Sequence, residues 1–430
     1  MRLCVIGAGP SGLAAAQALK ANGIPFDCFE KRDRIGGLWA FSETPGESAA
    51  YRSLNINTSR ERTQFAAFPM DAGTPDFPHH TQMAAYFNAY ADHFGLREHI
   101  RLNTAVTRAE RLSDGRWAVT LESGEVGQYD GLIVANGHHW DPRWPEPPFP
   151  GEFHGTVMHA HTYQDNRSLA GKRVLILGIG NSASDIAVES SFVAEKTFLA
   201  MRRGAYVVPR YLFGMPYDQV KNPGWLPWKL RQPCLELAYR LGVGKVEQYG
   251  MPRPDHHFGE AHPTVSDYLL ARVTHGYVTP KPNIAELQGD RVRFVDGSVE
   301  QVDLIIYCTG YQVTFPFFDP DFLSAPGNEL PLFRRVFKPG IDNLFFIGLL
   351  QPLGSIMPLA EAQAHWVAEY LTGRYTLPSE AEMQADIARE EAAIKARYVP
   401  SARHTMQVDF DTYLYQLAQE RRRGARRAKQ

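Results

Sequence analysis

Residues 3–16 read LCVIGAGPSGLAAA, an apolar run followed by a glycine-rich turn and an alanine-rich segment. The apolar run predicts a buried strand and the alanine-rich segment predicts a helix, so the glycines stand where a strand passes into a helix. In that context a G-x-G-x-x-G turn binds a dinucleotide, because its glycines allow a tight turn, close approach of a pyrophosphate and close packing of helix on strand. The pyrophosphate then lies at the positive N-terminal end of the helix. The predicted cofactor contacts here are Gly7, Gly9, Pro10, Ser11 and Gly12.

A second apolar run, residues 26–29, ends at Glu30, about the distance downstream at which an acid binds a ribose hydroxyl. We therefore predict that Glu30 also contacts the dinucleotide. A GGLW loop follows, which can lie along a flat ligand or be an ordinary turn. The cofactor candidates in this loop are Gly37, Leu38 and Trp39.

Residues 174–185, VLILGIGNSASD, repeat the opening design as strand, G-x-G-x-x-A turn and helix. The repeat predicts a second dinucleotide-binding domain, whose cofactor contacts would be Gly178, Gly180, Asn181 and Ser182. Its second strand, at 198–201, ends in Arg202 and Arg203 where an acid would bind a free ribose hydroxyl. Guanidinium groups at this position favour a 2′-phosphate, although a solvated strand end is the other interpretation. The sequence thus predicts FAD in the first domain and NADPH in the second.

These motifs predict an α/β fold with two Rossmann-like dinucleotide-binding domains, for FAD and NADPH, and an inserted cap region. We expect residues 1–165 to form the first part of the FAD-binding domain. Residues 166–309 would form the NADPH-binding domain, including an insertion at about 213–263 that is rich in proline, aromatic residues and histidine and has one helical stretch near 226–242. Residues 310–430 would form the second part of the FAD-binding domain and a helical tail. The basic run at 421–427 is interpreted as a solvated, frayed end.

Charge and composition exclude several classes of function. Lys and Arg together number 45 against 47 for Asp and Glu, so no overall field favours nucleic acid. No run of 18 apolar residues occurs, so no transmembrane anchor is expected. The start at Met1 leaves no room for a signal peptide, which predicts a cytoplasmic protein and leaves open whether it is a homodimer. His138 and His139 have no suitably spaced carboxylate or cysteine partner, so no metal site is predicted.

The chain resembles the flavin-containing monooxygenases over nearly its whole length. The most specific element is F-x-G-x-x-x-H-x-x-x-Y at residues 153–163, which is similar to a fingerprint of that family. The related Baeyer–Villiger monooxygenases carry Trp at the last position, where this chain has Tyr163. Five further stretches resemble family motifs: GGLW at 36–39, NGH at 136–138, CTGY at 308–311, QPLG at 351–354 and HTMQVD at 404–409. The resemblance adds Thr309, Gly310 and Gln351 to the predicted cofactor contacts.

Asn57 is the candidate catalytic residue. Taken by itself, the polar segment 51–61 predicts either a turn or a site residue at Asn57, since Asn is a common turn former. The pattern Y-R-x-L-x-x-N-x-x-R-E in this segment is similar to the family segment that holds the active-site asparagine. The resemblance therefore implies that Asn57 lies at the reactive face of the flavin and helps to keep its hydroperoxide intact.

The activity that the resemblance implies is oxygenation of a small molecule with FAD, NADPH and O₂. By this resemblance, NADPH would reduce FAD, dioxygen would add to give a 4a-hydroperoxyflavin, and a soft nucleophile such as a tertiary amine or thioether would attack the distal oxygen. Two alternatives share the fold: Baeyer–Villiger oxidation of ketones, which Tyr163 disfavours, and a flavin-dependent NADPH oxidase or reductase. A flavin disulfide reductase would need a redox pair of cysteines, and the four cysteines of this chain are scattered.

Overall fold

In the computed structural model, which describes residues 1–220 and 223–430, the first glycine motif follows the central strand of a parallel sheet. That strand is β1 (Leu3–Ile6), and all four of its residues are buried. It pairs with β2 on one side and β7 on the other, so an entirely apolar strand suits its position. Across this sheet the strands are, in order, β23 (Leu344–Phe346), β7 (Gly131–Val134), β1, β2 (Phe26–Phe29) and β3 (Ile100–Arg101).

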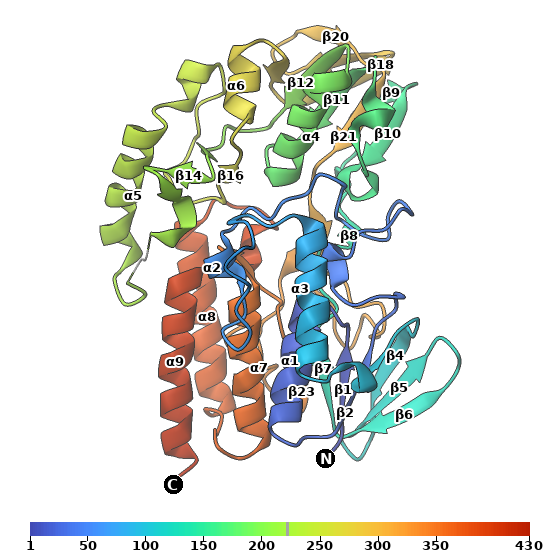
Figure 1. The fold of residues 1–430 in the computed structure, drawn as a ribbon, viewed down its shortest axis with the longest axis vertical. Coiled ribbons are helices and arrows are strands. Elements are labelled where there is room, and N and C mark those ends of the chain that lie inside the picture. The colour runs from blue at the N-terminus through green and yellow to red at the C-terminus, as the bar shows by residue number, and fades with distance from the viewer. Residues whose placement is uncertain (221–222) are drawn as a thin grey trace.

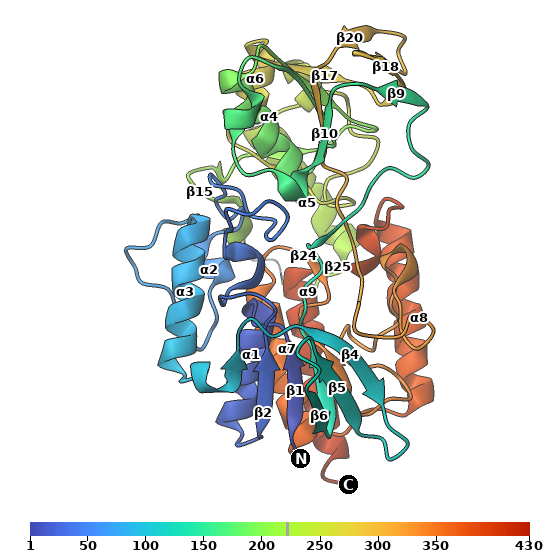
Figure 2. The same cartoon turned by 90° about the vertical axis from the view of Figure 1, so that its right-hand side faces the viewer.

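Helices cover one face of the first sheet, and a small antiparallel sheet covers the other (Figures 1 and 2). α1 (Pro10–Ala21) packs against α3 and α7. α3 faces the core with an apolar stripe, in which Met83, Phe87 and Tyr90 are fully buried. The other elements of this lobe are α2 (Arg60–Thr63), α3 (His80–His93), α7 (Met357–Leu371), α8 (Glu380–Arg397), α9 (Phe410–Arg427), β4 (Val106–Arg111), β5 (Trp117–Leu121) and β6 (Val126–Tyr129).

A second lobe repeats this design around the second glycine motif (Figure 1). The motif follows β11, which pairs in parallel with β12 and β21, and it leads into α4 (Asn181–Val193). β19 and β20 form an antiparallel hairpin in this lobe. The strands are β10 (Thr156–His159), β21 (Leu304–Tyr307), β11 (Arg173–Leu177), β12 (Lys196–Ala200) and β17 (Val278–Lys281), with a side sheet of β9 (Gly151–Phe153), β18 (Ile284–Gly289), β19 (Arg291–Phe294) and β20 (Val299–Gln301).

One strand departs from the predicted division of the chain. β10 precedes residue 166, yet it pairs with β21 in the second sheet, and Thr156 lies opposite Leu304. The preceding strand, β9, pairs with β18 in the side sheet of the same lobe. The chain has therefore already entered the second lobe at about residue 151.

The inserted region contains the helix expected at 226–242, observed as α5 (Trp228–Gly242), and it lies against the C-terminal helices (Figure 1). The buried Arg231 of α5 forms an ion pair of 3.3 Å with Asp409, which caps α9. Residues 221–222 of the insertion lie outside the described part. β15 (Met215–Pro216) also lies in the insertion and pairs with β14 (Tyr211–Leu212) just before it. Around the insertion, β13 (Val207–Val208) pairs with β16 (Thr264–Val265), and α6 (Leu269–Thr274) packs against α4. The remaining strands, β8 (Asp141–Pro142), β22 (Tyr311–Gln312), β24 (Gln351–Leu353) and β25 (Gln407–Asp409), form short pairs.

The basic C-terminal run is ordered, so its interpretation as a frayed end is wrong. α9 continues to Arg427, and Arg421 forms an ion pair of 2.5 Å with Glu369 of α7. Arg427 forms a second pair of 2.5 Å with the buried Glu420. Acidic partners from neighbouring turns and from α7 hold these arginines in place. Among residues 1–220 and 223–430, no helix is long and apolar enough to cross a membrane.

The packing of α1 on β1 predicts that Gly12→Ala destabilises the protein. A Cβ at Gly12 would lie 1.8 Å from the backbone oxygen of Gly7, so the helix and the strand would have to separate. Because backbone cannot yield as a flexible side chain does, we expect a loss of about 3 kcal/mol or more in the free energy of unfolding, measured by thermal denaturation. The control is Gly73→Ala, where a Cβ meets no atom within 4 Å. Equal unfolding temperatures for the two variants would contradict this account of the motif.

Candidate active site

A cavity of about 400 Å³ opens at the carboxyl end of the first sheet and extends to the N-terminus of α4 in the second lobe. Its size is typical of small-molecule and cofactor sites, which hold roughly 300–1,000 Å³. Eleven of the residues predicted from the sequence line it: Gly7, Gly9, Pro10, Ser11, Glu30, Gly37, Leu38, Trp39, Asn57, Asn181 and Gln351. The cavity therefore brings residues from distant parts of the chain to one place.

Two glycine turns form one wall of the cavity with backbone alone. A Cβ at Gly37 would lie 3.1 Å from the Cα of Gly9, so the two turns face each other closely. Gly7 has a φ of +103°, and a Cβ there would lie 2.6 Å from the carbonyl oxygen of Ala135. No side chain in the described part of the chain caps the N-terminus of α1, so the backbone N–H groups of its first turn are free to bind a ligand at the cavity. Gly12 does not line the cavity and acts through packing.

Glu30 lies buried at the end of β2, where it holds the glycine turn. Its carboxylate accepts a hydrogen bond of 2.8 Å from the backbone N–H of Ala8 and one of 3.0 Å from that of Arg32. The Arg32 guanidinium in turn donates to the carbonyl oxygens of Gly37, at 3.1 Å, and Ala40, at 2.7 Å. Burial lowers the pKa of Arg32. Sequence reasoning missed this arginine, although its place two residues after Glu30 was a usable signal.

The segment around Asn57 is fixed by its backbone. Tyr217, from the inserted region, donates a hydrogen bond of 3.2 Å to the carbonyl oxygen of Asn57. Asp218 accepts one of 2.6 Å from the backbone N–H of Ser59, and the N–H of Ile56 donates to Pro78 at 2.9 Å. Within the described part of the chain, the side-chain amide of Asn57 has no hydrogen-bond partner. The backbone is thus held while the amide stays available to the cavity.

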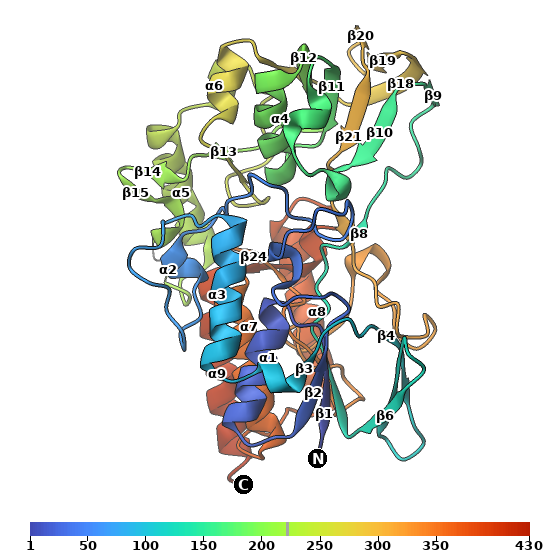
Figure 3. The ribbon, with the colours of Figure 1, turned by 45° about the vertical axis from the view of Figure 1, so that its right-hand side comes forward.

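The same segment is tied to α4 in the second lobe (Figure 3). Tyr51 donates a hydrogen bond to Asp185, and Tyr163, the last residue of the fingerprint, donates one of 2.5 Å to Glu189. Ser53 also donates to Glu189. Burial raises the pKa of Asp185 to about 6 and that of Glu189 to about 7. Tyr51 and Ser53 therefore join the lobes through α4, whereas Tyr163 bonds within the second lobe and does not line the cavity.

The second glycine motif differs from the first in how it meets the cavity. Gly178 has a φ of +132°, and a Cβ there would lie 2.6 Å from the carbonyl oxygen of Cys308. Asn181 lines the cavity while its side chain accepts a hydrogen bond of 2.8 Å from the backbone N–H of Val265. The other predicted residues of this lobe lie outside the cavity: Gly178, Gly180, Ser182, Arg202, Arg203, Thr309 and Gly310.

The two arginines after β12 stand in different surroundings. Arg202 is exposed, whereas Arg203 is partly buried, and its Nε lies 3.7 Å from a carboxylate oxygen of Asp255 in the inserted region. The insertion thus reaches the end of β12, the position at which a 2′-phosphate is recognised in this fold. Arg202 is the more accessible of the two guanidinium groups.

The remaining predicted contacts, Thr309, Gly310 and Gln351, lie at the junction of the lobes. Thr309 donates a hydrogen bond to the carbonyl oxygen of Arg143, and the carbonyl oxygen of Gly310 accepts one of 2.9 Å from the N–H of the same arginine. Gln351 lies in β24 opposite Gln407 of β25. The bonds of Thr309 and Gly310 to Arg143, and the pairing of β24 with β25, therefore hold chain segments together beside the cavity.

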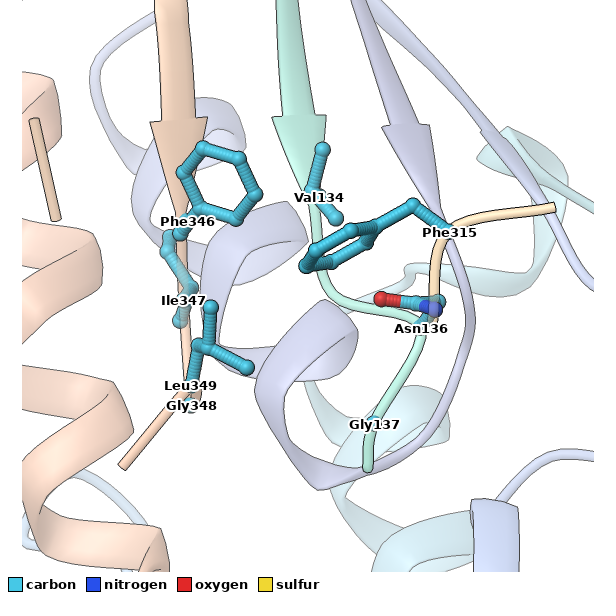
Figure 4. A pocket seen from close by; sticks show the side chains of 8 residues that line it. All are labelled: Val134, Asn136, Gly137, Phe315, Phe346, Ile347, Gly348 and Leu349. Carbon is cyan, nitrogen blue, oxygen red and sulfur yellow. The ribbon is translucent and has the colours of Figure 1, made fainter. Parts of the chain in front are cut away.

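A narrow crevice adjoins the cavity between the carboxyl ends of β7 and β23. Figure 4 shows Phe315 reaching toward Val134 and Phe346, with Asn136 below it. The amide of Asn136 donates a hydrogen bond of 3.2 Å to the carbonyl oxygen of Thr314, which holds this aromatic segment against the sheet. The crevice is part of the packed wall behind the cavity.

Several imidazoles lie at the cavity without forming a metal site. His138 and His161 line it, and each keeps a buried Nδ1 without a hydrogen-bond partner. Burial lowers the pKa of His138 to about 4, so its ring is neutral at pH 7. In the part of the chain that the structure describes, no group of three or more His, Cys, Asp or Glu side chains is placed to hold a metal ion.

The donor set fits a dinucleotide cofactor. It combines a wall of glycine backbone, an uncapped helix N-terminus for a pyrophosphate and a buried carboxylate at the ribose position. The second lobe repeats the glycine turn and the uncapped helix. A fold with two such motifs beside one cavity defines an oxidoreductase that works with a flavin and a nicotinamide dinucleotide.

Comparison with known proteins identifies the family. Residues 1–423 match the family described as flavin-binding monooxygenase-like. The chain is 37% identical to flavin-containing monooxygenase 5 of Homo sapiens over 438 residues, covering 97% of this chain and 82% of the relative. It is 34% identical to dimethylaniline monooxygenase [N-oxide-forming] 2 of Oryctolagus cuniculus over 441 residues, with the same coverage of 97% and 82%. The chain belongs to the flavin-binding monooxygenase-like family and is an FAD-dependent monooxygenase that uses NADPH and O₂.

The fold is also that of a solved oxygenase. The structure of S-allyl-L-cysteine S-oxygenase from Allium sativum matches with a TM-score of 0.73 at 23% identity, over 100% of this chain and 92% of that chain. The predictions of the family, the α/β fold with two dinucleotide-binding units, and both cofactors are confirmed.

The link between the lobes predicts how stability depends on pH. Because the pKa of Asp185 in the folded protein, about 6, exceeds its ordinary value, the carboxyl group stabilises the fold when protonated. Its contribution is fully present below about pH 4 and is lost as the pH rises through about 6. Asp185→Asn keeps an acceptor for Tyr51 without the charge, so between pH 5 and pH 8 it should lose roughly 1–1.5 kcal/mol less stability than the parent.

Thermal unfolding across that pH range measures this difference. The exposed Glu195→Gln, just beyond the same helix, serves as the control and should follow the parent. If Asp185→Asn and the parent lost stability in parallel with rising pH, the assignment of this titration to Asp185 would be wrong.

Proposed function

We propose that the cavity of the first lobe holds the flavin and that Asn57 is the residue that directs oxygen transfer. The observation that carries the proposal is the combination of a fixed backbone and an unpartnered side-chain amide at Asn57. Hydrogen bonds to Tyr217 and Asp218 fix the position of this segment, so the amide is preorganised toward the cavity. A donor held in this way stabilises a polar group in the cavity with little reorganisation.

The FAD contacts would come from both parts of the first lobe. Gly7, Gly9 and the N-terminus of α1 would hold the pyrophosphate, and Glu30 would bind the ribose. The GGLW loop and Gln351 would lie along the rest of the cofactor. The corresponding domain division is a flavin-binding unit of residues 1–150 and 310–430 around a nucleotide-binding unit that starts at about 151. β10 supports placing the boundary before residue 156.

NADPH would occupy the second lobe, with Gly178, Gly180 and the N-terminus of α4 at its pyrophosphate. Asn181 and Ser182 begin that helix, and Arg202 and Arg203 would bind the 2′-phosphate at the end of β12. Thr309 and Gly310 would support the turn that faces the first lobe. When bound, NADPH supplies a hydride and the flavin activates dioxygen. The protein's part is to orient both cofactors, exclude water and hold a donor at Asn57.

The substrate would be a soft nucleophile, a tertiary amine or a thioether. The names of the relatives support this class, since one forms N-oxides and the solved oxygenase acts on sulfur. Apolar side chains of the cavity, among them Ile56, Phe317 and Met357, favour a small, largely apolar substrate. A product screen with amines, thioethers and ketones separates heteroatom oxygenation from ketone oxidation. The cytoplasmic location and the homodimer stay predictions.

Asn57→Leu tests the function directly. The substitution keeps most of the volume and removes both the donor and the acceptor, while reduction of the flavin by NADPH does not need the amide. Anaerobic flavin reduction should stay within several-fold of the parent rate. Oxygenated product per NADPH consumed should fall by the equivalent of about 2–4 kcal/mol, as for loss of one preorganised donor, with NADPH consumption diverted to H₂O₂.

The matched control is Asn55→Leu, because the amide of Asn55 donates to the carbonyl oxygen of Phe77 at 3.0 Å and does not line the cavity. This control should keep the parent's ratio of product to NADPH. An unchanged ratio in Asn57→Leu would show that Asn57 is a structural turn residue.

A further inference from the structure

A partly buried arginine that has no acidic partner among the described residues lies where the two lobes meet. Arg403 follows α8 and precedes the short helix η8 (His404–Met406), and it lines the cavity together with Asn181 and His262. Its Nε is buried and has no hydrogen-bond partner. Among the residues that the structure describes, no carboxylate forms an ion pair with its guanidinium.

Neighbouring arginines of the same region are paired. Arg397 lies 3.4 Å from Asp409, and Arg335 lies 3.0 Å from Glu390. Taking a guanidinium out of water without a counter-charge is unfavourable, and burial lowers the pKa of Arg403 to about 10. A negatively charged ligand in the cavity would supply the missing partner.

The guanidinium of Arg403 stands beside the N-terminus of α4. Its Nη1 lies 3.5 Å from the place where a Cβ of Gly180 would be, and Gly180 is the N-cap residue of that helix. Among residues 1–220 and 223–430, no side chain caps this helix, and its first turn contains no acidic residue. The helix end and the guanidinium are both positive and repel each other. An anion bound between them would remove this repulsion and interact favourably with both.

The backbone around Arg403 is fixed to the first lobe. His404 Nδ1 donates to the carbonyl oxygen of Val399 at 2.5 Å, and the hydroxyl of Thr405 donates to that of Asn328 at 2.9 Å. The strand that follows, β25, pairs with β24. A segment anchored on the first lobe therefore places the guanidinium of Arg403 beside the glycine motif of the second lobe.

We propose that Arg403 binds the pyrophosphate of NADPH at the N-terminus of α4 and thereby joins the bound nucleotide to the first lobe. The inference rests on the proposed placement of NADPH in the second lobe. Arg403 would bind the pyrophosphate and not the 2′-phosphate, because Arg403 faces the glycine turn after β11, whereas Arg202 follows β12. Two elements far apart in the sequence thus share one ligand group.

The test compares two ligands on the FAD-loaded protein by calorimetric titration. NADP⁺ carries the pyrophosphate, and adenosine 2′-monophosphate lacks it. Arg403→Gln should raise the Kd of NADP⁺ about 10–100-fold and leave that of adenosine 2′-monophosphate within two-fold. Arg202→Gln, the matched control, should weaken both ligands. Arg403→Lys keeps the charge and should lose less affinity for NADP⁺ than Arg403→Gln does.

Thermal unfolding without nucleotide separates a binding role of Arg403 from a structural role. If Arg403 stabilised the fold, Arg403→Gln would unfold at a lower temperature than the parent. Because Arg403 has no partner among the described residues, Arg403→Gln should unfold at or above the temperature of the parent. An NADP⁺ affinity within two-fold of the parent, or an equal loss for both ligands, would overturn the inference. A parent protein that binds FAD and no NADP⁺ would overturn the proposed function and this inference with it.

Discussion

The site depends on backbone approaching backbone at the first glycine motif. A Cβ at Gly12 would lie 1.8 Å from the oxygen of Gly7, and one at Gly7 would lie 2.6 Å from that of Ala135. Helix, strand and the turn after β7 therefore close on one another only because these positions have no side chain. This contact places the N-terminus of α1 at the cavity and brings the turn at Gly37 opposite Gly9. The polar side chains of the site are then arranged around a surface of backbone.

A second constraint is that the candidate catalytic segment is held by two separate parts of the chain, α4 and the insertion. Tyr51 bonds to Asp185 of α4, Ser59 bonds to Asp218 of the insertion, and Asn57 accepts a bond from Tyr217. A movement of the second lobe or of the insertion would therefore be transmitted to Asn57. The insertion is thus part of the active-site support as well as a cover beside the C-terminal helices.

The sequence predicts those features whose signals are local. Both glycine motifs, the strands beside them and α5 follow from apolar periodicity and turn residues that lie within about 20 positions. The place of β10 was missed because its partner β21 lies far along the chain, and no local pattern states which sheet a short strand joins. The sequence did not predict that the C-terminal basic run is helical and held in place, because the partner of Arg421 is Glu369 on another helix, α7. Arg403 has no periodic signal, since its meaning comes from contact with Gly180.

The central claim is that the backbone-lined cavity of the first lobe holds FAD. The most direct measurement is chromatography of the cofactor released when the purified protein is denatured, with its amount compared with the amount of protein. The account predicts a yellow protein that releases about one FAD per chain, as a single G-x-G-x-x-G motif with an acid at the ribose position would bind. Release of NAD in place of FAD, or of no flavin by a protein reconstituted with excess FAD, would contradict it.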